Sequence, residues 1–266
     1  MKIAIIGTGN LGESIAKGIL EKELTSSLWL TKRQLEKLEK YKTFHGVYVT
    51  SNNIEAIKNA EILIFTLQPI HQEKVLNEVK TYLKPKHTII STAAGFSIEK
   101  IESIVGKERA IILAMPNTAI SVGKSMTCLC SNDLAKDDVE IVKKIFNSLG
   151  HTMLIPGAQM QAATVVCASG IAFWMRLIRA TTQAAIQLGF DAREAQELAI
   201  YTCEGSAKLL IENGLHPEQE IDQVTTPKGC TIEGLNEMEH SGLSSSLIKG
   251  MVASYNKISN IKHKEL

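Results

Sequence analysis

Three glycines near the start of the chain have the spacing of a phosphate-binding turn. Gly7, Gly9 and Gly12 fit the pattern G-x-G-x-x-G, between an apolar run at residues 2–6 that indicates a strand and a helical pattern from Asn10. In such a turn the first glycine permits the bend, the second lets the backbone approach a pyrophosphate, and the third lets the helix pack closely. The amides and dipole at the helix start attract a diphosphate. A glycine-rich turn without a ligand is the alternative, but this context favours dinucleotide binding by Gly7, Thr8, Gly9, Asn10, Leu11 and Gly12.

Residues at the expected end of the second strand bear on which dinucleotide binds. Thr31, Lys32 and Arg33 follow an apolar run at residues 28–30. An NAD site usually carries an acidic residue there for the ribose hydroxyl, whereas a hydroxyl and two cations suit the 2′-phosphate of NADP. An ordinary charged helix start is the alternative, although the helix dipole disfavours cations at that position. We predict NADP(H) as the cofactor, with NADH as an alternative.

Further cofactor contacts are expected where other strands end, because ligands of such sheets bind beyond the carboxyl ends of the strands. Three successive strands are expected to end in small or turn-forming residues, at 67–69, 93–95 and 115–118. Each is also compatible with a plain turn from strand to helix. Together they leave room for a ligand along Leu67, Gln68, Pro69, Ala93, Ala94 and Asn117.

A second candidate site lies in the latter half of the chain, where a Pro-Lys-Gly turn at residues 227–229 leads into a helix. The amides near Gly229, Cys230 and Thr231 have no partner inside that helix and form a pocket suited to a carboxylate. Thr231 presents a hydroxyl at the same place. The alternative is that Thr231 is simply the N-cap of the helix.

Composition limits the classes of function. The chain has 266 residues, 44% hydrophobic and 21% charged, with a formal net charge of +1, as expected for one or two globular domains. No basic field indicates nucleic-acid binding, and Met1-Lys2 leads directly into a core strand, so we expect no signal peptide. No apolar run approaches membrane-spanning length, and we expect a cytoplasmic protein without a membrane partner. Five scattered cysteines and seven histidines without ligand spacing predict reduced thiols and no metal site.

Strand and helix patterns alternate over residues 1–156, which predicts an α/β domain with a doubly wound sheet of the Rossmann type and right-handed crossovers. Residues 157–266 show helical patterns instead, and the long helices are expected at 159–188, 192–213 and 232–257. Stretches as apolar as residues 162–168 rarely face only water. We therefore predict an all-α second domain that forms a dimer.

Three motifs together resemble the pyrroline-5-carboxylate reductase family: G-T-G-N-L-G at residues 7–12, M-P-N-T at 115–118 and V-T-T-P-K-G-C-T-I-E-G-L-N-E-M-E at 224–239. The last is the most specific and is similar to the family's T-S-P-G-G-T-T-x-x-G-L-x-x-L-E. The resemblance extends to about residue 258. It implies a Rossmann domain with a helical dimerisation domain, a homodimer that in many members forms a decamer, and reduction of 1-pyrroline-5-carboxylate to L-proline by NADPH or NADH.

The resemblance also implies roles for matching residues. Thr231 corresponds to the threonine whose hydroxyl approaches the substrate's ring nitrogen, and Gly229 and Cys230 to the amides that hold its carboxylate. Asn117 corresponds to an asparagine beside the nicotinamide, and Asn53 to one that contacts the cofactor.

The chain departs from the family in three places. Gln68 stands where the family has a lysine, and Lys228 where it has the first glycine of P-G-G. Residues 167–173 read C-A-S-G-I-A-F where the family has S-G-S-G-P-A-Y. In the family that segment lines the substrate site, so it bears on substrate preference.

Three other functions are alternatives to this one. A reductase of the β-hydroxyacid dehydrogenase type would carry a catalytic lysine early in the first long helix, and residues 159–172 contain none. A related imine reductase and an NADP(H)-binding protein without turnover are the further alternatives.

Overall fold

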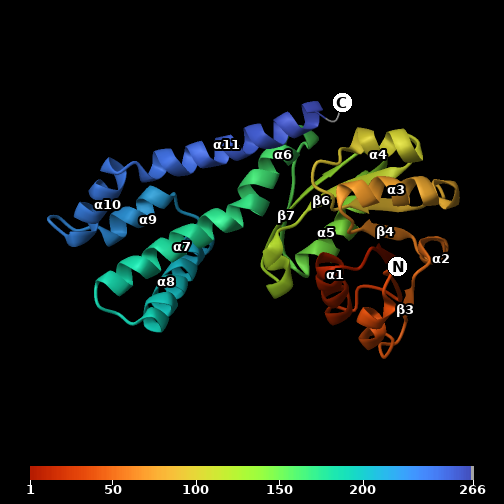
Figure 1. Cartoon of the computed structure of the whole chain (residues 1–266), viewed down its shortest axis with the longest axis horizontal. Coiled ribbons are helices and arrows are strands. Elements are labelled where there is room, and N and C mark those ends of the chain that lie inside the picture. Colours follow the sequence, from red (N-terminus) through yellow and green to blue (C-terminus); the bar gives the residue numbers. More distant parts are fainter. Residues whose placement is uncertain (265–266) are drawn as a thin grey trace. The chain divides into compact units, whose positions relative to one another are not determined.

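The computed structural model describes residues 1–264. These residues form two compact units (Figure 1). The first contains Met1–Ser169 together with residues 258–264, and the second contains Gly170–Lys257.

The first unit is built on an eight-stranded sheet with the order β3-β2-β1-β4-β5-β6-β7-β8. Strand order reverses on either side of β1, which confirms the predicted doubly wound sheet. Its central strands are short runs rich in isoleucine and leucine that are buried on both faces, as parallel strands covered by helices must be. The strands are β1 (Lys2–Ile6), β2 (Ser27–Thr31), β3 (Val47–Thr50), β4 (Ile62–Phe65), β5 (Thr88–Ser91), β6 (Ala110–Met115), β7 (Ser125–Ser131) and β8 (Gly150–Leu154).

Strand β7 departs from the expected alternation because it runs antiparallel to β6. The connection between Met115 and Ser125 holds only a short 3-10 helix, η3 (Thr118–Val122). A parallel pairing needs a crossover of a dozen or more residues, which this connection is too short to provide. The next strand, β8, again pairs in parallel with β7 after helix α5.

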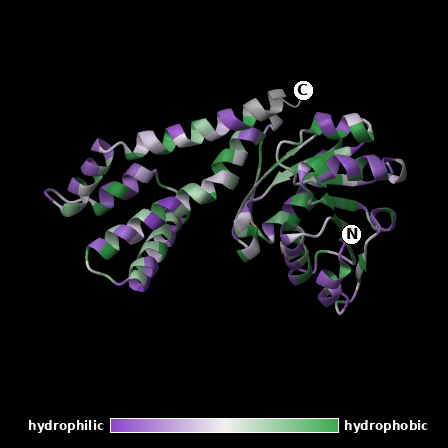
Figure 2. Ribbon diagram, in the orientation of Figure 1, coloured by the Kyte–Doolittle hydropathy of each residue, from purple (hydrophilic) through white to green (hydrophobic). Residues whose placement is uncertain are grey.

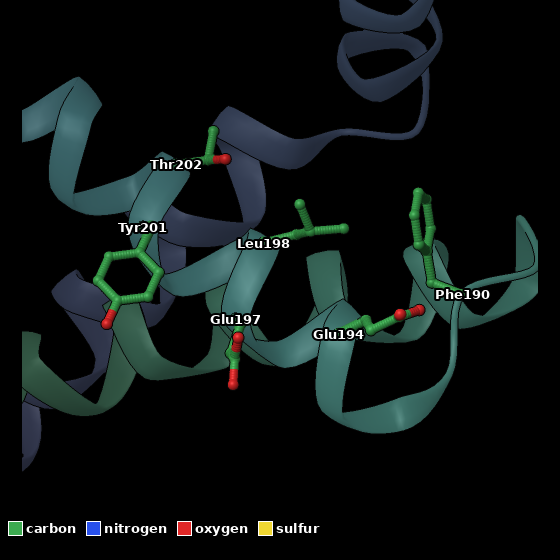
Figure 3. Close-up of a pocket in the computed structure, with 6 residues that line it drawn as sticks. All are labelled: Phe190, Glu194, Glu197, Leu198, Tyr201 and Thr202. Atoms are coloured by element: carbon green, nitrogen blue, oxygen red, sulfur yellow. The ribbon is translucent and has the colours of Figure 1, made fainter.

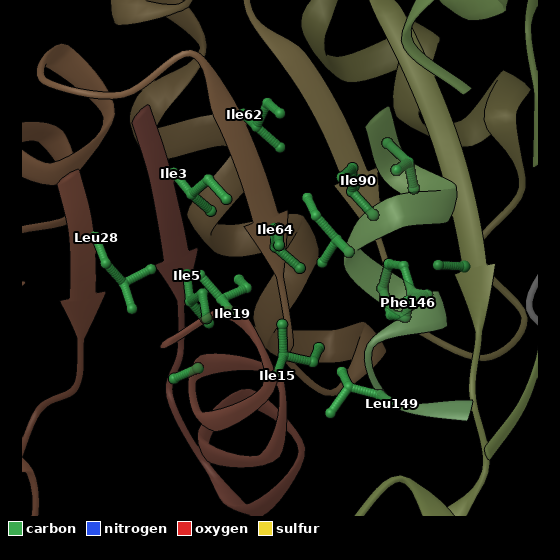
Figure 4. Packing of buried hydrophobic residues seen from close by; sticks show 14 of the residues in the cluster. Ile3, Ile5, Ile15, Ile19, Leu28, Ile62, Ile64, Ile90, Phe146 and Leu149 are labelled. Carbon is green, nitrogen blue, oxygen red and sulfur yellow. The ribbon is translucent and has the colours of Figure 1, made fainter. Parts of the chain in front are cut away.

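Helices cover both faces of this sheet. Alternate residues of β1 point to opposite faces, so Ile3 belongs to one buried cluster and Ala4 to the other. Helices α1 (Asn10–Glu21) and α5 (Val139–Asn147) and the 3-10 helix η1 (Leu35–Tyr41) pack on the first cluster (Figure 4). Helices α2 (Asn53–Lys58), α3 (Pro69–Val79) and α4 (Ile98–Val105) pack on the second.

Helix α4 is amphipathic and begins with a side-chain cap. Ser97 is the N-cap, and its hydroxyl oxygen accepts a hydrogen bond from the amide of Lys100. The unit also contains η2 (Lys80–Tyr82), η4 (Asp133–Asp138), η5 (Gly157–Gln159), α6 (Met160–Ala163) and a π-helical turn, η6 (Thr164–Ser169).

The second unit is helical, as predicted. Helices α7 (Gly170–Gln187) and α8 (Ala192–Asn213) pack against each other as a hairpin (Figure 1). They are followed by α9 (Pro217–Val224), α10 (Cys230–His240) and α11 (Leu243–Lys264), of which the part up to Lys257 belongs to this unit.

Three helix predictions need correction. The helix expected at residues 159–188 changes to π-helical geometry at η6 before α7 begins. The helix expected at 232–257 is two helices, because the chain turns at Gly242, which has a φ of 79°. Helix α9 was missed, since its sequence P-E-Q-E-I-D-Q-V is too polar and short to show an apolar stripe.

The expectation that no apolar stretch reaches membrane-spanning length is also wrong. Among the described residues, the helical stretch Gly157–Gln187 is long and apolar enough to cross a membrane, and 11% of its most apolar window is buried within the chain. Figure 2 shows hydrophobic residues distributed along α7 and α8. One such helix does not indicate a membrane protein, because an apolar helix that is covered by another subunit has the same character.

Candidate functional site

The glycine turn after β1 has the geometry that its sequence predicts. Gly7 has a φ of +87°, a conformation that favours glycine, and a Cβ there would lie 2.1 Å from Leu67 Cδ2. Gly12 lies against the sheet, where a Cβ would be 2.8 Å from Thr66 Oγ1. Gly9 is the N-cap of α1 and offers no side-chain cap, so the first amides of α1 stay available to a phosphate. The turn therefore fits a dinucleotide diphosphate.

Neighbouring strands hold this turn in place through Thr31 and Thr66. Thr31 is buried, its Oγ1 accepts a hydrogen bond from the Gly7 amide at 3.0 Å, and its carbonyl accepts one from the Thr8 amide at 2.7 Å. Thr66 Oγ1 donates to the Gly7 carbonyl at 2.9 Å. Thr31 thus supports the turn, which corrects the prediction that its hydroxyl faces a 2′-phosphate. Thr66 was missed because a threonine after an apolar run carries no motif.

Lys32, one of the two cations predicted to select NADP, lies beside an acidic residue. Lys32 Nζ is 3.2 Å from Glu13 Oε1, and Lys40 Nζ is 2.8 Å from Glu13 Oε2. Partial burial opposes ionisation of Glu13, but the hydrogen bonds from Lys40 and Lys32 outweigh it and lower the pKa of the carboxyl. Arg33 is exposed, and the part of the chain that the structure describes gives its guanidinium no partner.

The other predicted cofactor residues occupy the ends of strands or the starts of helices. Gln68 is the exposed N-cap of α3, with Pro69 as its first residue. Ala93 is buried and Ala94 exposed after β5. Asn53 is the half-buried first residue of α2, behind the N-cap Asn52. The sheet brings the segments after β1, β2, β4, β5 and β6 to one edge, as parallel strands require.

Asn117 joins the turn after β6 to the π-helical turn. Its Oδ1 accepts from the Ala119 amide at 3.0 Å, and its Nδ2 donates to the Cys167 carbonyl at 3.2 Å. The Asn117 amide donates to Ser125 Oγ at 3.0 Å. The side chain predicted to lie beside the nicotinamide is therefore fixed by both of its polar ends.

Cys167, the first residue of the divergent segment, forms a thiol pair with Cys128. The two sulfur atoms are 3.8 Å apart, Cys128 is buried in β7, and Cys167 is half-buried in η6. The hydrogen bond from Cys128 lowers the pKa of Cys167 to about 7, and the same contact, together with burial, raises the pKa of Cys128. This pair was not predicted, because the two residues are far apart in the chain and have no motif spacing.

The second candidate site is the turn before α10. The Gly229 amide donates to the Thr226 carbonyl at 2.9 Å, so this amide is engaged within the turn. Lys228 has a φ of 60°, the left-handed conformation that the third residue of a type II turn requires and that glycine adopts more easily. Gly229 is the N-cap of α10, without a side-chain cap bond, which excludes the alternative that Thr231 is the N-cap.

The start of α10 retains the features of a carboxylate site. A Cβ on Gly229 would lie 2.5 Å from Thr226 Oγ1, so the turn closes tightly and admits glycine there. Cys230 and Thr231 are the first residues of α10, whose initial amides lack helical partners. Cys230 is exposed and Thr231 is half-buried. These residues belong to the second unit, and the cofactor residues belong to the first.

A hollow on the surface of α8 contains none of the predicted site residues (Figure 3). It has a volume of about 620 Å³. Its two carboxylates and exposed apolar groups do not suit an anionic dinucleotide. It is lined by Phe190, Glu194, Glu197, Leu198, Tyr201 and Thr202.

Two family models match the chain. Residues 2–95 match the model for NADP oxidoreductases, coenzyme F420-dependent, and residues 157–261 match the model for pyrroline-5-carboxylate reductase dimerisation. The first range contains the glycine turn, and the second contains the turn before α10.

Individual relatives carry the same family name. Pyrroline-5-carboxylate reductase 2 of Dictyostelium discoideum is 40% identical over 97% of this chain and 92% of that protein. Pyrroline-5-carboxylate reductase 1 of the same organism is 44% identical over 97% of this chain, which spans 49% of that longer protein.

Solved structures agree over the whole fold. A pyrroline-5-carboxylate reductase from Coxiella burnetii has a TM-score of 0.92 at 28% identity, covering 97% of each chain. The pyrroline carboxylate reductase of Plasmodium falciparum, solved with NADP bound, has a TM-score of 0.84 at 26% identity, also over 97% of each chain. This chain therefore belongs to the pyrroline-5-carboxylate reductase family.

Proposed function

We propose that the protein reduces the C=N bond of 1-pyrroline-5-carboxylate to give L-proline, with NADPH as the preferred hydride donor and NADH as an alternative. The observation that carries this proposal is the start of α10. There, a glycine N-cap without a side-chain bond leaves the first-turn amides open beside the half-buried Thr231 hydroxyl. This arrangement suits a small ring that carries both a carboxylate and a nitrogen.

The residues of the first unit suit the binding of the dinucleotide. The first amides of α1 would hold its diphosphate, and Lys32 and Arg33 would face the 2′-phosphate. Bound NADPH supplies the hydride. The Asn117 side chain, whose oxygen and nitrogen are both hydrogen-bonded, would define one wall of the nicotinamide site together with the Cys167 backbone.

The residues of the second unit suit the binding of the substrate. The amides of Cys230 and Thr231 would hold the carboxylate, while the Gly229 amide stays in its turn with Thr226. The Thr231 hydroxyl would bond to the ring nitrogen and orient the imine carbon. Such positioning lowers the barrier without a strong acid when the imine arrives protonated.

We further propose a homodimer that forms through the helical unit, with a decamer as the larger assembly, in the cytoplasm. Among the described residues of α7 and α8, Trp174 is 57% exposed, Tyr201 69% and Ile211 79%. Large apolar side chains exposed to this extent are typical of surfaces that another subunit covers. Light scattering after gel filtration distinguishes a dimer from a decamer, and a monomer would contradict the proposal.

The test of activity is the oxidation of NADPH by purified protein with 1-pyrroline-5-carboxylate, in parallel with NADH. We expect turnover with both and a preference for NADPH. Thr231→Ala should lower kcat/KM by roughly tenfold to a hundredfold, and Thr231→Ser, which keeps the hydroxyl, should restore most of it. Equal activity of the alanine variant and the wild type would remove Thr231 from the mechanism.

Three outcomes would favour the alternatives. Oxidation of a β-hydroxyacid with NADP⁺ would indicate the related dehydrogenase chemistry, and turnover of other cyclic imines would indicate a broader imine reductase. Binding of NADPH without turnover of any of these would indicate a non-catalytic binding protein. The divergent residues 167–173 would then be the segment to exchange for the family sequence.

A further inference from the structure

Glu13 contacts Lys32, one of the residues expected to face the cofactor's 2′-phosphate. It follows Gly12 directly in the first turn of α1, and its two carboxylate oxygens each bind a different lysine. Lys32 comes directly after β2, and Lys40 lies in η1. One carboxylate thus connects three elements around the predicted 2′-phosphate position.

The ion pair between Glu13 and Lys32 is partly buried, so its interaction is stronger than that of an exposed surface ion pair. The side chain of Lys32 is 20% exposed and that of Glu13 is 22% exposed, whereas Lys40 is 59% exposed. Interactions between partly buried charges are screened less than those at the surface. The carboxylate therefore acts on Lys32 and on any anion that approaches it.

The negative charge of Glu13 opposes the binding of NADPH, the cofactor that the nearby cations would favour. Without Glu13, Lys32 and Arg33 after β2 and Lys40 in η1 would be three cations available to a 2′-phosphate that carries about two negative charges. Glu13 neutralises one of these charges and occupies donors that the phosphate needs. NADH has a hydroxyl at that position, which carries no charge and can donate to a carboxylate.

We propose that Glu13 is a specificity-determining residue that competes with the 2′-phosphate for Lys32 and Lys40 and so reduces the preference for NADPH over NADH. The inference rests on the proposed function, since it concerns the same cofactor site. Glu13 was not singled out from the sequence, because an acidic residue in the first turn of a helix is common.

The test is a calorimetric titration of the full chain with NADPH and, separately, with NADH, both without substrate. Glu13→Gln removes the charge and keeps the size and the hydrogen-bonding capacity. It should lower the NADPH dissociation constant by roughly tenfold, because removal of one partly screened charge ends the competition for the two lysines, and it should change that for NADH less than twofold. Glu21→Gln, an exposed change of equal charge at the other end of α1, should alter neither.

A reciprocal variant keeps the inference falsifiable if Glu13→Gln is unstable. Lys40→Gln leaves Glu13 with one lysine, and it should raise the NADPH dissociation constant severalfold with little effect on NADH. Both differences should shrink as salt is raised. Equal changes for the two dinucleotides would assign Glu13 a structural role and overturn the inference. Wild-type protein that binds neither dinucleotide would overturn the cofactor assignment as well.

Discussion

The hydroxyl oxygen of Thr31 accepts a hydrogen bond from the Gly7 amide at 3.0 Å, which joins the end of β2 to the glycine turn after β1. Gly7 has a φ of +87°, a conformation that favours glycine. The threonine is buried, so water cannot replace its oxygen. The second strand therefore helps to hold the turn in the conformation that a diphosphate needs.

Replacing Thr31 by valine tests this support. The change keeps the shape of the side chain and leaves the Gly7 amide without its acceptor, which should lower the free energy of unfolding by about 1–3 kcal/mol and weaken NADPH binding. Thr31→Ser keeps the oxygen and is the control. Urea unfolding and NADPH titration measure both effects, and a valine variant as stable as the serine variant would contradict the role.

The fold was largely predictable because its signals are local. Apolar runs such as residues 62–65 mark strands buried on both faces, and the alternation of strands and helices specifies a doubly wound sheet. The antiparallel direction of β7 follows from the short connection that joins it to β6, and the alternation of strands and helices does not report the length of a connection. Helix α9 is held by Pro217 and by the His216 capping box, features of single residues that a search for apolar periodicity overlooks.

The candidate site was predictable only where its chemistry follows a motif. The glycine turn and the turn before α10 were predicted because their residue spacing is tied to a turn and a helix start, and the role of Thr231 stays a prediction. Thr31 was assigned to the ligand, although β-strand alternation directs its side chain into the turn. The Glu13 cluster brings together residues up to 27 positions apart and depends on side-chain reach, which no local pattern reports.

Replacing Gly229 by alanine should disrupt the carboxylate site. The new methyl group would lie 2.5 Å from Thr226 Oγ1, so the turn must open and the start of α10 must shift. We expect the KM for pyrroline-5-carboxylate to rise by about tenfold or more, with little change in NADPH affinity.

Lys228→Gly in the same turn is the matched control. It relieves the left-handed backbone at a φ of 60° and restores the family's glycine, so KM should change little. Steady-state kinetics with varied substrate compares the two variants. A rise in KM of similar size in both would show that KM responds to any change in this turn.

Cys167 should be alkylated at a pH well below that of an ordinary thiol. Its pKa of about 7 means that half of it is thiolate near neutral pH, so the rate with iodoacetamide should rise with a midpoint near pH 7. Cys128→Ala removes the hydrogen bond at 3.8 Å and should move this midpoint upward. Peptide mapping by mass spectrometry follows Cys167 separately from the other thiols, and an unchanged midpoint would contradict the pairing.

His87 should make the protein lose stability as the pH falls from about 6.5 to about 4. Its imidazole is fully buried, and burial, followed by the nearby charges of Lys84, Lys86 and Arg109, lowers its pKa from 6.5 to about 4. The unfolded chain takes up a proton below about pH 6.5, whereas the folded protein does so only near pH 4. The contribution of His87 to the free energy of unfolding is therefore fully present above the unfolded pKa and decreases as the pH falls, by up to about 3 kcal/mol.

The variant His87→Asn tests this prediction. It keeps an acceptor for the Lys84 amide and cannot be protonated, so its free energy of unfolding in urea should change less between pH 7 and pH 4.5. Parallel curves for the variant and the wild type would show that other groups cause the acid sensitivity.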